Sequence, residues 1–437
     1  MNIILLSGGS GTRLWPLSND IRAKQFLKIF CDDKGNSESM LQKMYRNIKA
    51  INPNNRILIA ALEEQSSIIQ SQLSDYVEIS VEPCRRDTFP AIALAAAYLH
   101  DINGIDENET VVVCPIDPLV DTGYYHMLEE MSLSAINENL VLMGIKPTAP
   151  SSKYGYILGK SFKEKPSEFE ASNLIDQGAL WNAGVFAFKL SYILEKASCL
   201  LGSSSYKYLF QHYANLPKIS FDYAVVEHEP DFITLEYDGT WADLGTWDSL
   251  SNAMNGVNIG SAKAVNCHNT QIINELSIPV LSIGIDNAVI VSTQDGILVT
   301  DKIMSPQLKE YAVEVALRPM YEEKKWGYYK ILDYHTNSSG QQIITKELVI
   351  NSRKSISYQV HLYRSELWTI IDGFGYVVID GSIVKVEQGI CISIQPMKKH
   401  SVYAVEEMRI IETQFGSHLS EQDIIRYDWD WNKQINS

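Results

Sequence analysis

The residues best suited to chemistry near the amino terminus form the loop Gly8-Gly9-Ser10-Gly11-Thr12-Arg13, which directly follows a short apolar run. Three glycines within four positions let the backbone approach a ligand closely and direct N–H groups at an anion. Arg13 and Lys24 add positive charge nearby. This combination favours phosphoryl or nucleotidyl transfer, which depends mainly on positioning and charge neutralisation. The loop has neither the GK[ST] ending of a P-loop nor the dinucleotide fingerprint, and a glycine-rich turn without a ligand is the competing interpretation.

Two aspartates far apart in the sequence are the next candidates. Asp117 ends the buried apolar run 111–116, and an acidic residue at the carboxyl end of a strand faces the ligand-binding edge of an α/β sheet. Asp243 lies among aromatic residues in the segment 240–247, TWADLGTW. Either aspartate taken alone is as readily a turn or a helix-cap residue.

A third group of candidates lies near the carboxyl terminus. Gln359, His361 and Glu366 precede Gly373, and His400 follows later. Alternation along a strand places Gln359 and His361 on one face, as a metal site requires. This order and spacing is that of the metal ligands of a cupin. A structural role for these side chains within a β barrel is the competing interpretation.

The elements that must position the first two groups alternate between strand and helix. Such alternation predicts a mainly parallel, three-layer α/β sheet, in which ligands bind beyond the carboxyl ends of the strands. The predicted strands are residues 3–6, 56–60, 77–81, 110–114 and 140–145, and the clearest helices are 91–100 and 125–136.

The pattern changes after residue 256. Short β-branched segments separated by Asn, Asp and Gly predict rungs of a β-helix or small sheet, and a helix is expected over 304–317. From about residue 325 strands dominate, with turn signals at the spacing of an all-β sandwich or barrel. We therefore expect three parts, residues 1–256, a connector over 257–318, and residues 319–437. The rungs are expected at 271–273, 280–283, 288–291 and 297–299.

Length and composition agree with this organisation. A chain of 437 residues, 45% apolar and 21% charged, is long enough for two or three soluble domains. Its net charge of −16 disfavours general binding to nucleic acid or to anionic membranes. The six scattered cysteines include no CxxC pair, so no zinc knuckle or redox motif is predicted. The sequence shows no signal peptide and no apolar run near the roughly 20 residues of a membrane span, so we expect a cytoplasmic protein.

The segment 7–18, SGGSGTRLWPLS, followed by Lys24-Gln25-Phe26-Leu27, resembles the signature of the sugar-nucleotide pyrophosphorylases. Within that superfamily, its Trp-Pro-Leu-Ser and Lys-Gln-Phe-Leu elements are specific to mannose-1-phosphate guanylyltransferases. The resemblance continues in order through nearly the whole chain. It implies a Rossmann-like nucleotidyltransferase domain that joins GTP to mannose 1-phosphate and releases diphosphate.

The same resemblance implies a role for each residue of the first two groups. Arg13 would stabilise the leaving pyrophosphate, and Lys24 would contact the α-phosphate. Asp117 and Asp243 would hold Mg²⁺, which prefers hard oxygen ligands. Pro118 departs from the family, which usually has His after the first Asp. The nucleotide contacts would come from Gly8, Gly9, Gly11, Thr12, Glu82, Arg86 and Asp87.

Three further segments, 154–157, 164–166 and 181–184, resemble the sugar-phosphate pocket of that family. Glu164 and Asn182 would exchange hydrogen bonds with sugar hydroxyls, and Lys165 would pair with the sugar phosphate. Asp222 would support the pocket. The implied substrate contacts are Tyr154, Gly155, Glu164, Lys165, Asn182 and Asp222.

Two departures leave the substrates open. Asp87 and Arg85 replace the usual Asn and Gly of the base-reading segment 82–92, although an Asp still accepts hydrogen bonds from guanine N1–H and N2–H₂. The stretch between Tyr156 and Glu164 is shorter than usual. The alternatives are therefore another base or sugar 1-phosphate, or a regulator that binds a nucleotide sugar without catalysis. The intact Arg13, Lys24, Asp117 and Asp243 argue against the regulator.

The carboxy-terminal region resembles the type II phosphomannose isomerase domain, a cupin barrel often fused to this guanylyltransferase. Its Gln359, His361, Glu366 and His400 would bind Zn²⁺ or another divalent metal. An isomerase and an inert, structural cupin both stay open, because several family positions differ. The departures are Arg353, Leu362, Tyr363, Leu367, Gln395 and Met397. The candidate partners are GTP, mannose 1-phosphate and, as a homodimer, a second copy of the chain.

Overall fold

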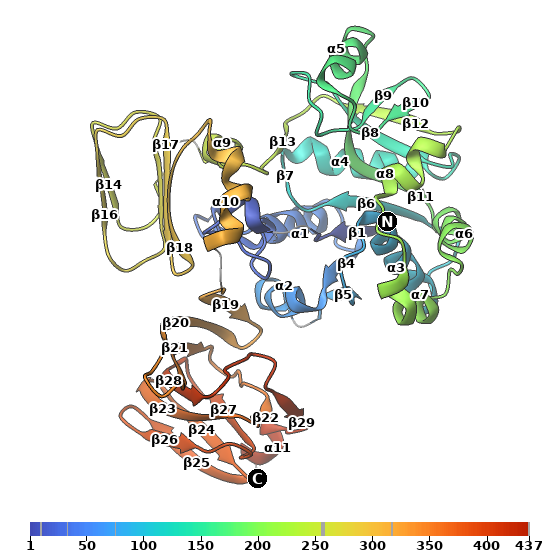
Figure 1. Cartoon of the computed structure of the whole chain (residues 1–437). Coiled ribbons are helices and arrows are strands. Elements are labelled where there is room, and N and C mark those ends of the chain that lie inside the picture. The colour runs from blue at the N-terminus through green and yellow to red at the C-terminus, as the bar shows by residue number, and fades with distance from the viewer. Residues whose placement is uncertain (9–10, 33, 75, 255–257, 316–317, 436–437) are drawn as a thin grey trace.

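The computed structural model describes residues 1–8, 11–32, 34–74, 76–254, 258–315 and 318–435. Figure 1 shows three lobes: an α/β lobe coloured blue to green, a yellow lobe of short strands, and an orange-red β lobe that ends the chain. The predicted boundary between residues 256 and 257 falls outside the described residues.

The amino-terminal lobe is built on one nine-stranded sheet with a parallel centre. Its central order is β6-β1-β4-β5, and these four strands run parallel. β11 pairs antiparallel with β6, so the strands added later in the chain make the sheet mixed. The predicted α/β sheet is confirmed. Its strands are β1 (Asn2–Leu6), β4 (Arg56–Leu62), β5 (Glu78–Glu82), β6 (Thr110–Pro115), β8 (Val141–Ile145), β9 (Tyr156–Leu158), β10 (Ser161–Lys163), β11 (Leu180–Lys189) and β12 (Ile233–Tyr237).

Helices cover both faces of this sheet because successive apolar side chains along its strands point to opposite faces, and both faces must be buried. Ile3 and Leu5 of β1 belong to the cluster that contains α1, α2 and α4, whereas Ile4 belongs to the one that contains α3, α6 and α7. No helix in the described ranges has the length and apolar character needed to span a bilayer. The helices are α1 (Met40–Ile51), α2 (Ser66–Gln72), α3 (Thr88–Asp101), α4 (Thr122–Ser134), α5 (Glu168–Asp176), α6 (Leu190–Leu201), α7 (Tyr206–His212), α8 (Phe221–Ala224) and α9 (Trp247–Ala253).

The connector has the predicted β-helix-like rungs. β14 (Ala262–Val265) pairs parallel with β16 (Val280–Ile283), and β15 (Gln271–Asn274) pairs parallel with β17 (Ala288–Thr293). β18 (Gly296–Asp301) then turns back antiparallel to β17. The helix predicted over 304–317 is the short 3-10 turn η6 (Ser305–Gln307) followed by α10 (Leu308–Val315), and residues 316–317 lie outside the described ranges.

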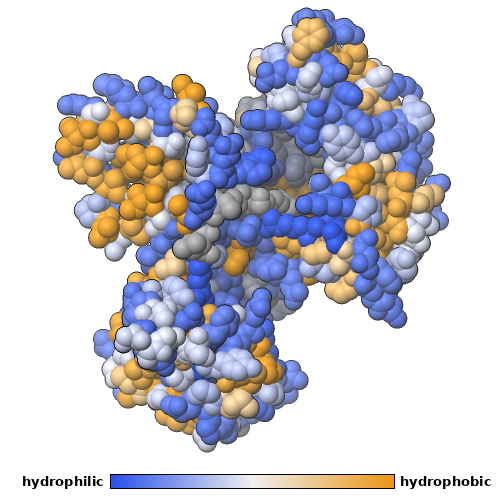
Figure 2. Space-filling model, viewed as in Figure 1, coloured by the Kyte–Doolittle hydropathy of each residue, from blue (hydrophilic) through white to orange (hydrophobic). Residues whose placement is uncertain are grey.

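The connector carries several exposed apolar side chains. Figure 2 shows hydrophobic residues gathered over this lobe. Leu281, Ile283, Ile297 and Val299 each keep more than 60% of their surface exposed, with values of 62%, 62%, 63% and 66%. Large contiguous apolar surfaces on soluble proteins mark interaction sites.

The carboxy-terminal lobe is the predicted all-β region. A six-stranded sheet, β19-β20-β21-β28-β23-β26, faces a five-stranded sheet, β25-β24-β27-β22-β29. Trp368, Val377 and Ile410 belong to the core cluster between them. The strands are β19 (Tyr321–Lys324), β20 (Gly327–Thr336), β21 (Gln342–Ile350), β22 (Tyr358–Val360), β23 (Arg364–Asp372), β24 (Phe374–Ile379), β25 (Ser382–Glu387), β26 (Cys391–Ile394), β27 (His400–Ala404), β28 (Met408–Gly416) and β29 (Ile425–Tyr427), before α11 (Trp431–Ile435).

Residues 22–28 of the amino-terminal lobe contact both of the other lobes. Arg22 donates two hydrogen bonds of 2.8 Å to the Glu275 carboxylate of the connector. Lys28 Nζ lies 3.2 Å from Glu323 Oε2 of β19. Charged contacts therefore join the three lobes through the segment that contains Lys24, the predicted catalytic lysine.

Candidate active site

The carboxyl ends of β1 and β6 bring the glycine loop and Asp117 together. Leu6 at the end of β1 is the register partner of Pro115 at the end of β6. Because parallel neighbours end at one edge of a sheet, the residues that follow them emerge side by side. A cleft of about 180 Å³ opens there. Its lining residues include Gly8, Arg13, Lys24, Gln25, Asp117 and Lys309.

Asp243 reaches the same place through a separate two-stranded sheet. β13 (Trp241–Asp243) runs antiparallel to β7 (Pro118–Val120), and Asp243 pairs with Pro118. This register places Asp243 beside the residue that follows Asp117. The two predicted metal ligands therefore converge, and Pro118 is the pairing partner that aligns them.

Lys24 lies between the two carboxylates. Its Nζ is 2.7 Å from Asp117 Oδ2 and 3.0 Å from Asp243 Oδ1. Burial alone would lower the pKa of Lys24, but the charges of the two aspartates raise it above its ordinary value. Two carboxylates directed at one cationic centre form a donor set that fits Mg²⁺, a hard cation that takes oxygen ligands.

The residues next to Lys24 hold it against the glycine loop. Lys24 begins the 3-10 turn η2 (Lys24–Phe26). Gln25 is 2% exposed, and its Nε2 donates to Ser7 O at 2.9 Å and to Ser7 Oγ at 3.1 Å. Gln25 thus ties the lysine to the start of the loop, a positioning contact that sequence reasoning missed although the residue lies within the quoted motif.

The glycine loop is described in part. Gly9 lies outside the described residues, and Gly11 and Thr12 open the 3-10 turn η1 (Gly11–Leu14) that contains Arg13. No described atom beyond its chain neighbours lies within 4 Å of the position that a Cβ of Gly8 would take. The space above Gly8 is therefore open to a ligand.

A second cleft, of about 220 Å³, shares Asp117 with the first. It is lined by five of the six residues predicted for the sugar phosphate. Lys165 is the sixth and is exposed; its Nζ pairs with Glu164 Oε1 at 2.8 Å. The lining includes Tyr154, Gly155, Glu164, Asn182, Asp222, Trp241 and Asp243.

A bulge in β11 positions Asn182 in this second cleft. The pairing of β11 with β8 shifts register between Asn182 and Phe186, and Gly184 within the shift has a φ of 70°. A bulge re-aims the side chains beside it. Asn182 Nδ2 donates to Asp222 Oδ1 at 2.6 Å, and its Oδ1 accepts from Gly184 N at 3.1 Å.

The raised pKa of Asp222 predicts that the stability of the folded chain depends on pH. Burial, with a smaller contribution from the charge of Glu164, raises its pKa from 3.8 to about 7. Between these values the folded chain keeps a proton that the unfolded chain has lost, so stability falls as the pH rises from about 4 to 7. We expect the unfolding temperature of Asp222→Asn to fall less than that of the wild type between pH 5 and 7. Asp176→Asn, at an exposed site, is the control, and equal slopes for all three proteins would contradict the prediction.

The predicted base-reading residues lie at the same sheet edge but do not line either cleft. Glu82 ends β5 and accepts a 2.7 Å hydrogen bond from the Tyr213 hydroxyl, and burial raises its pKa to about 6. Arg86 Nε donates to Tyr213 O at 3.2 Å. Asp87 caps α3, accepting from the first N–H of that helix at 2.8 Å. These side chains have internal partners, and their contact with a base stays a prediction.

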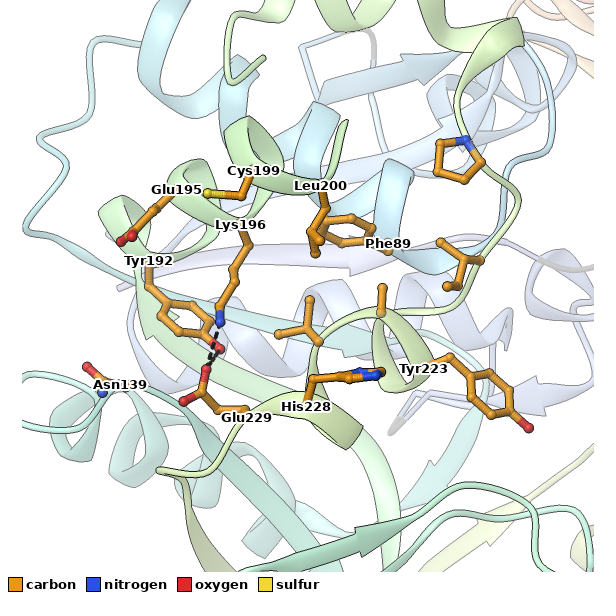
Figure 3. Close-up of a pocket in the computed structure, with 14 residues that line it drawn as sticks. Phe89, Asn139, Tyr192, Glu195, Lys196, Cys199, Leu200, Tyr223, His228 and Glu229 are labelled. Carbon is orange, nitrogen blue, oxygen red and sulfur yellow. Dashed lines mark hydrogen bonds and ion pairs between the residues drawn. The ribbon is translucent and has the colours of Figure 1, made fainter. Parts of the chain in front are cut away.

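A further cavity, of about 720 Å³, is lined in part by Tyr223 and Ala224 of α8. Figure 3 shows its polar side, where Tyr192 donates to Glu229 Oε2 at 2.6 Å and Lys196 Nζ lies 2.9 Å from the same oxygen. Tyr223 of α8 lines this cavity, whereas Asp222 lines the second cleft. The cavity contains none of the predicted site residues.

The carboxy-terminal candidates converge inside the β lobe. His361 Nε2 is 3.2 Å from Glu366 Oε1, and His400 Nε2 is 3.4 Å from Glu366 Oε2. All three side chains are at most 2% exposed. Gln359 Nε2 lies 3.4 Å from His361 Nε2. The predicted ligands therefore form one buried cluster, whose three His and Glu ligand atoms all lie within 4.8 Å of one another.

This cluster fits a divalent metal. Each histidine Nδ1 contacts a backbone oxygen, at 2.5 Å from Asp423 O and 2.9 Å from Lys398 O, which leaves Nε2 facing inward. Burial lowers the pKa of His361 to about 4, which favours the neutral, ligating imidazole. Glu366 Oε2 and His400 Nε2 make no hydrogen bond within the described part of the chain. Zn²⁺ or a similar ion would satisfy both atoms.

A three-layer α/β domain whose glycine loop, lysine and two aspartates meet at the carboxyl edge of its sheet has the architecture of a phosphate-transferring enzyme. Residues 2–259, more than half of the chain, match the family model described as Nucleotidyl transferase. The chain therefore belongs to the nucleotidyl transferase family, and the predicted enzyme class is confirmed. Residues 317–429 match a second model, described as Mannose-6-phosphate isomerase C-terminal.

Relatives match the chain along almost its full length. A Mannose-1-phosphate guanylyltransferase of Salmonella montevideo is 28% identical over 97% of this chain and 98% of its own. The Xanthan biosynthesis protein XanB of Xanthomonas campestris is 28% identical, with 97% of each chain covered. A crystal structure from Thermus thermophilus, described as a mannose-1-phosphate geranyltransferase, is 28% identical with a TM-score of 0.62, covering 72% of this chain and 99% of that one.

Proposed function

We propose that this protein is a mannose-1-phosphate guanylyltransferase, which converts GTP and α-D-mannose 1-phosphate into GDP-mannose and diphosphate. The observation that carries the proposal is the meeting of Asp117 and Asp243 at Lys24, between a glycine-loop cleft and a polar second cleft. The full-length likeness to guanylyltransferases supports these substrates. The likeness to a xanthan biosynthesis protein supports a role in supplying GDP-mannose for polysaccharide.

The geometry suits an in-line transfer. The nucleotide would occupy the glycine-loop cleft and the sugar phosphate the second cleft, with Asp117 in their common wall. A phosphate oxygen of the sugar phosphate attacks the α-phosphorus, and the bond to the diphosphate breaks. Lys24 would neutralise charge on the α-phosphate, and Arg13 would neutralise the departing diphosphate. Asp117 and Asp243 would hold Mg²⁺, which supplies further charge neutralisation when bound.

The sugar contacts follow from the second cleft. Glu164 and Asn182 would hydrogen-bond to sugar hydroxyls, and Asp222 orients the Asn182 amide. Lys165 forms an ion pair with Glu164 and would neutralise the sugar phosphate. Recognition of guanine by Asp87 remains a prediction.

The direct test mixes the full-length protein with Mg²⁺, GTP and mannose 1-phosphate and follows diphosphate release. A panel of other nucleotides and sugar 1-phosphates runs in parallel. Preference for another pair would replace the substrates but keep the chemistry. Absence of release with every pair would reject the enzyme proposal, and binding of GDP-mannose without turnover would favour the regulator instead.

Substitution of Gly155 by alanine is expected to weaken sugar binding selectively. A Cβ at this position would lie 2.6 Å from Glu164 Oε2 and 2.6 Å from Phe162 Cζ. Gly155→Ala should therefore displace Glu164 and raise KM for mannose 1-phosphate by roughly 10- to 100-fold, the range expected for small misplacements of a positioning group. Steady-state kinetics with each substrate varied would measure this. The KM for GTP is the internal control, and an equal rise in both constants would contradict a local effect.

We propose that the β lobe binds a divalent metal and that mannose-6-phosphate isomerisation is its second candidate activity. The buried cluster of His361, Glu366 and His400, with two atoms lacking hydrogen bonds, supports the metal. Metal analysis of the purified protein, followed by an assay for interconversion of mannose and fructose 6-phosphates, tests the two statements separately. Bound metal without interconversion would leave a structural cupin.

We also propose that the chain forms a homodimer in the cytoplasm. The exposed apolar side chains of the connector, among them Leu281, Ile283, Ile297 and Val299, support the association. Sedimentation equilibrium of the full-length protein tests it, because a monomer at micromolar concentration would reject the dimer. The cytoplasmic location stays a prediction.

A further inference from the structure

We propose that Lys309 of α10 binds the terminal phosphates of the nucleotide, so that the connector contributes a residue to the catalytic cleft. The identity of the ligand rests on the proposed function, whereas the position of the lysine does not. Every residue predicted for nucleotide chemistry lies before residue 257. A single lysine in a short helix carries no motif that would have revealed it.

The placement of Lys309 follows from the packing of α10. This helix contacts η1, the turn that contains Arg13, and Figure 1 shows it between the connector strands and the amino-terminal lobe. Leu308 packs against the core of the amino-terminal lobe, and Ala312 is 1% exposed. The adjacent Lys309 remains exposed and lines the same cleft as Gly8 and Arg13.

Side-chain contacts fix the start of α10 to the connector. Lys302, only 7% exposed, donates from Nζ to Asn269 Oδ1 at 2.7 Å. Ser305 Oγ donates to Lys302 O at 2.8 Å. These contacts order the turn from which α10 begins, so Lys309 approaches the cleft from a supported helix rather than from a free loop.

The positive charges of Arg13 and Lys309 favour the binding of an anion in this cleft. Lys24 is neutralised by two aspartates, but neither Arg13 nor Lys309 forms an ion pair with a carboxylate in the described ranges. Two cations that share one cleft repel each other, in a protein whose net charge of −16 offers many carboxylates elsewhere. An anion bound between the two cations would replace this repulsion with attraction, and the open space above Gly8 leaves room for it.

The position along the nucleotide follows from the arrangement of the two clefts. Asp117 lines both, so the α-phosphate, where transfer occurs, belongs near Asp117 and Lys24. Arg13 and Lys309 line only the nucleotide cleft. They are therefore placed for the two phosphates that leave, and a lysine serves there as a compact point charge.

The test uses inorganic tripolyphosphate with Mg²⁺ as the probe, measured by calorimetry on the full-length protein. Lys309→Met should raise Kd by about tenfold, the expected loss for one charged hydrogen bond. Lys309→Arg should recover most of the affinity. Lys263→Met, at an exposed lysine of β14 in the same lobe, is the matched control. Equal affinities for the two methionine variants would overturn the proposal.

Kinetics separate a phosphate contact from a structural role. Lys309→Met should raise KM for GTP and, in the reverse reaction, for diphosphate, with KM for mannose 1-phosphate unchanged. Equal rises for all substrates, with a lowered unfolding temperature, would assign Lys309 to the packing of α10 and overturn the proposal. Tripolyphosphate binding needs no turnover, so a wild-type protein that binds it but catalyses nothing would refute only the proposed reaction. A wild-type protein that binds none would overturn the role of Lys309.

Discussion

Asp243→Asn is expected to lower kcat by roughly 100- to 1000-fold, the range seen when one group that stabilises a transition-state charge is removed. The Asp243 carboxylate lies 3.0 Å from Lys24 Nζ and converges with Asp117. Its loss removes one of the two predicted Mg²⁺ ligands and one of the two anions that position the lysine. Diphosphate release at saturating GTP and mannose 1-phosphate, titrated with Mg²⁺, would measure the change.

The substitution is nearly isosteric and the Asp243 side chain is 34% exposed, so the unfolding temperature should stay close to that of the wild type. Asp248→Asn, in the exposed first turn of α9, is the matched control and should retain wild-type turnover. An Asp243→Asn enzyme with near-normal kcat would show that the convergence at Lys24 has no catalytic role.

Arg364→Met should destabilise the β lobe by about 3–5 kcal/mol in metal-free protein, because it leaves a buried carboxylate without its cation. Arg364 Nε lies 2.9 Å from Glu366 Oε1, and the two side chains are 3% and 1% exposed. Denaturant unfolding followed by near-ultraviolet circular dichroism would report the loss. Addition of Zn²⁺ should restore part of it, because the ion would replace the lost positive charge at Glu366.

The control for this second variant is Arg409→Met. Arg409 pairs with Glu347 at 2.8 Å in the same lobe, but its side chain is 42% exposed, so its loss should cost no more than about 1 kcal/mol. Equal destabilisation by the two substitutions would contradict the distinction between a buried and an exposed pair. A failure of Zn²⁺ to stabilise Arg364→Met would count against the metal site.

Local sequence signals were sufficient for the parts of the site that lie next to strand ends. The apolar runs before Gly8 and Asp117 predict adjacent strands, and the register of Leu6 with Pro115 agrees. β11 was not predicted as a strand. Asn182 and Gly184 interrupt its apolar residues, and a glycine inside a strand pattern weakens the strand signal.

Long-range pairing accounts for what the sequence did not reveal. The convergence of Asp243 on Asp117 was expected only through a family resemblance, because it depends on the antiparallel register of β13 with β7. The position of Lys24 between the aspartates depends on contacts between distant segments of the amino-terminal lobe. The reach of Lys309 into the cleft depends on the packing of the connector against that lobe. No spacing or periodicity within one segment encodes such contacts.

The charged contacts of residues 22–28 bear on how this polypeptide can be divided. Lys24 lies between Arg22 and Lys28, whose carboxylate partners, Glu275 and Glu323, belong to the later two lobes. A polypeptide that ended after the first lobe would lack Glu275 and Glu323, so Arg22 and Lys28 would lose these ion-pair partners on either side of the proposed catalytic lysine. The three lobes are therefore not independent modules, because the later two help to hold the segment that contains Lys24.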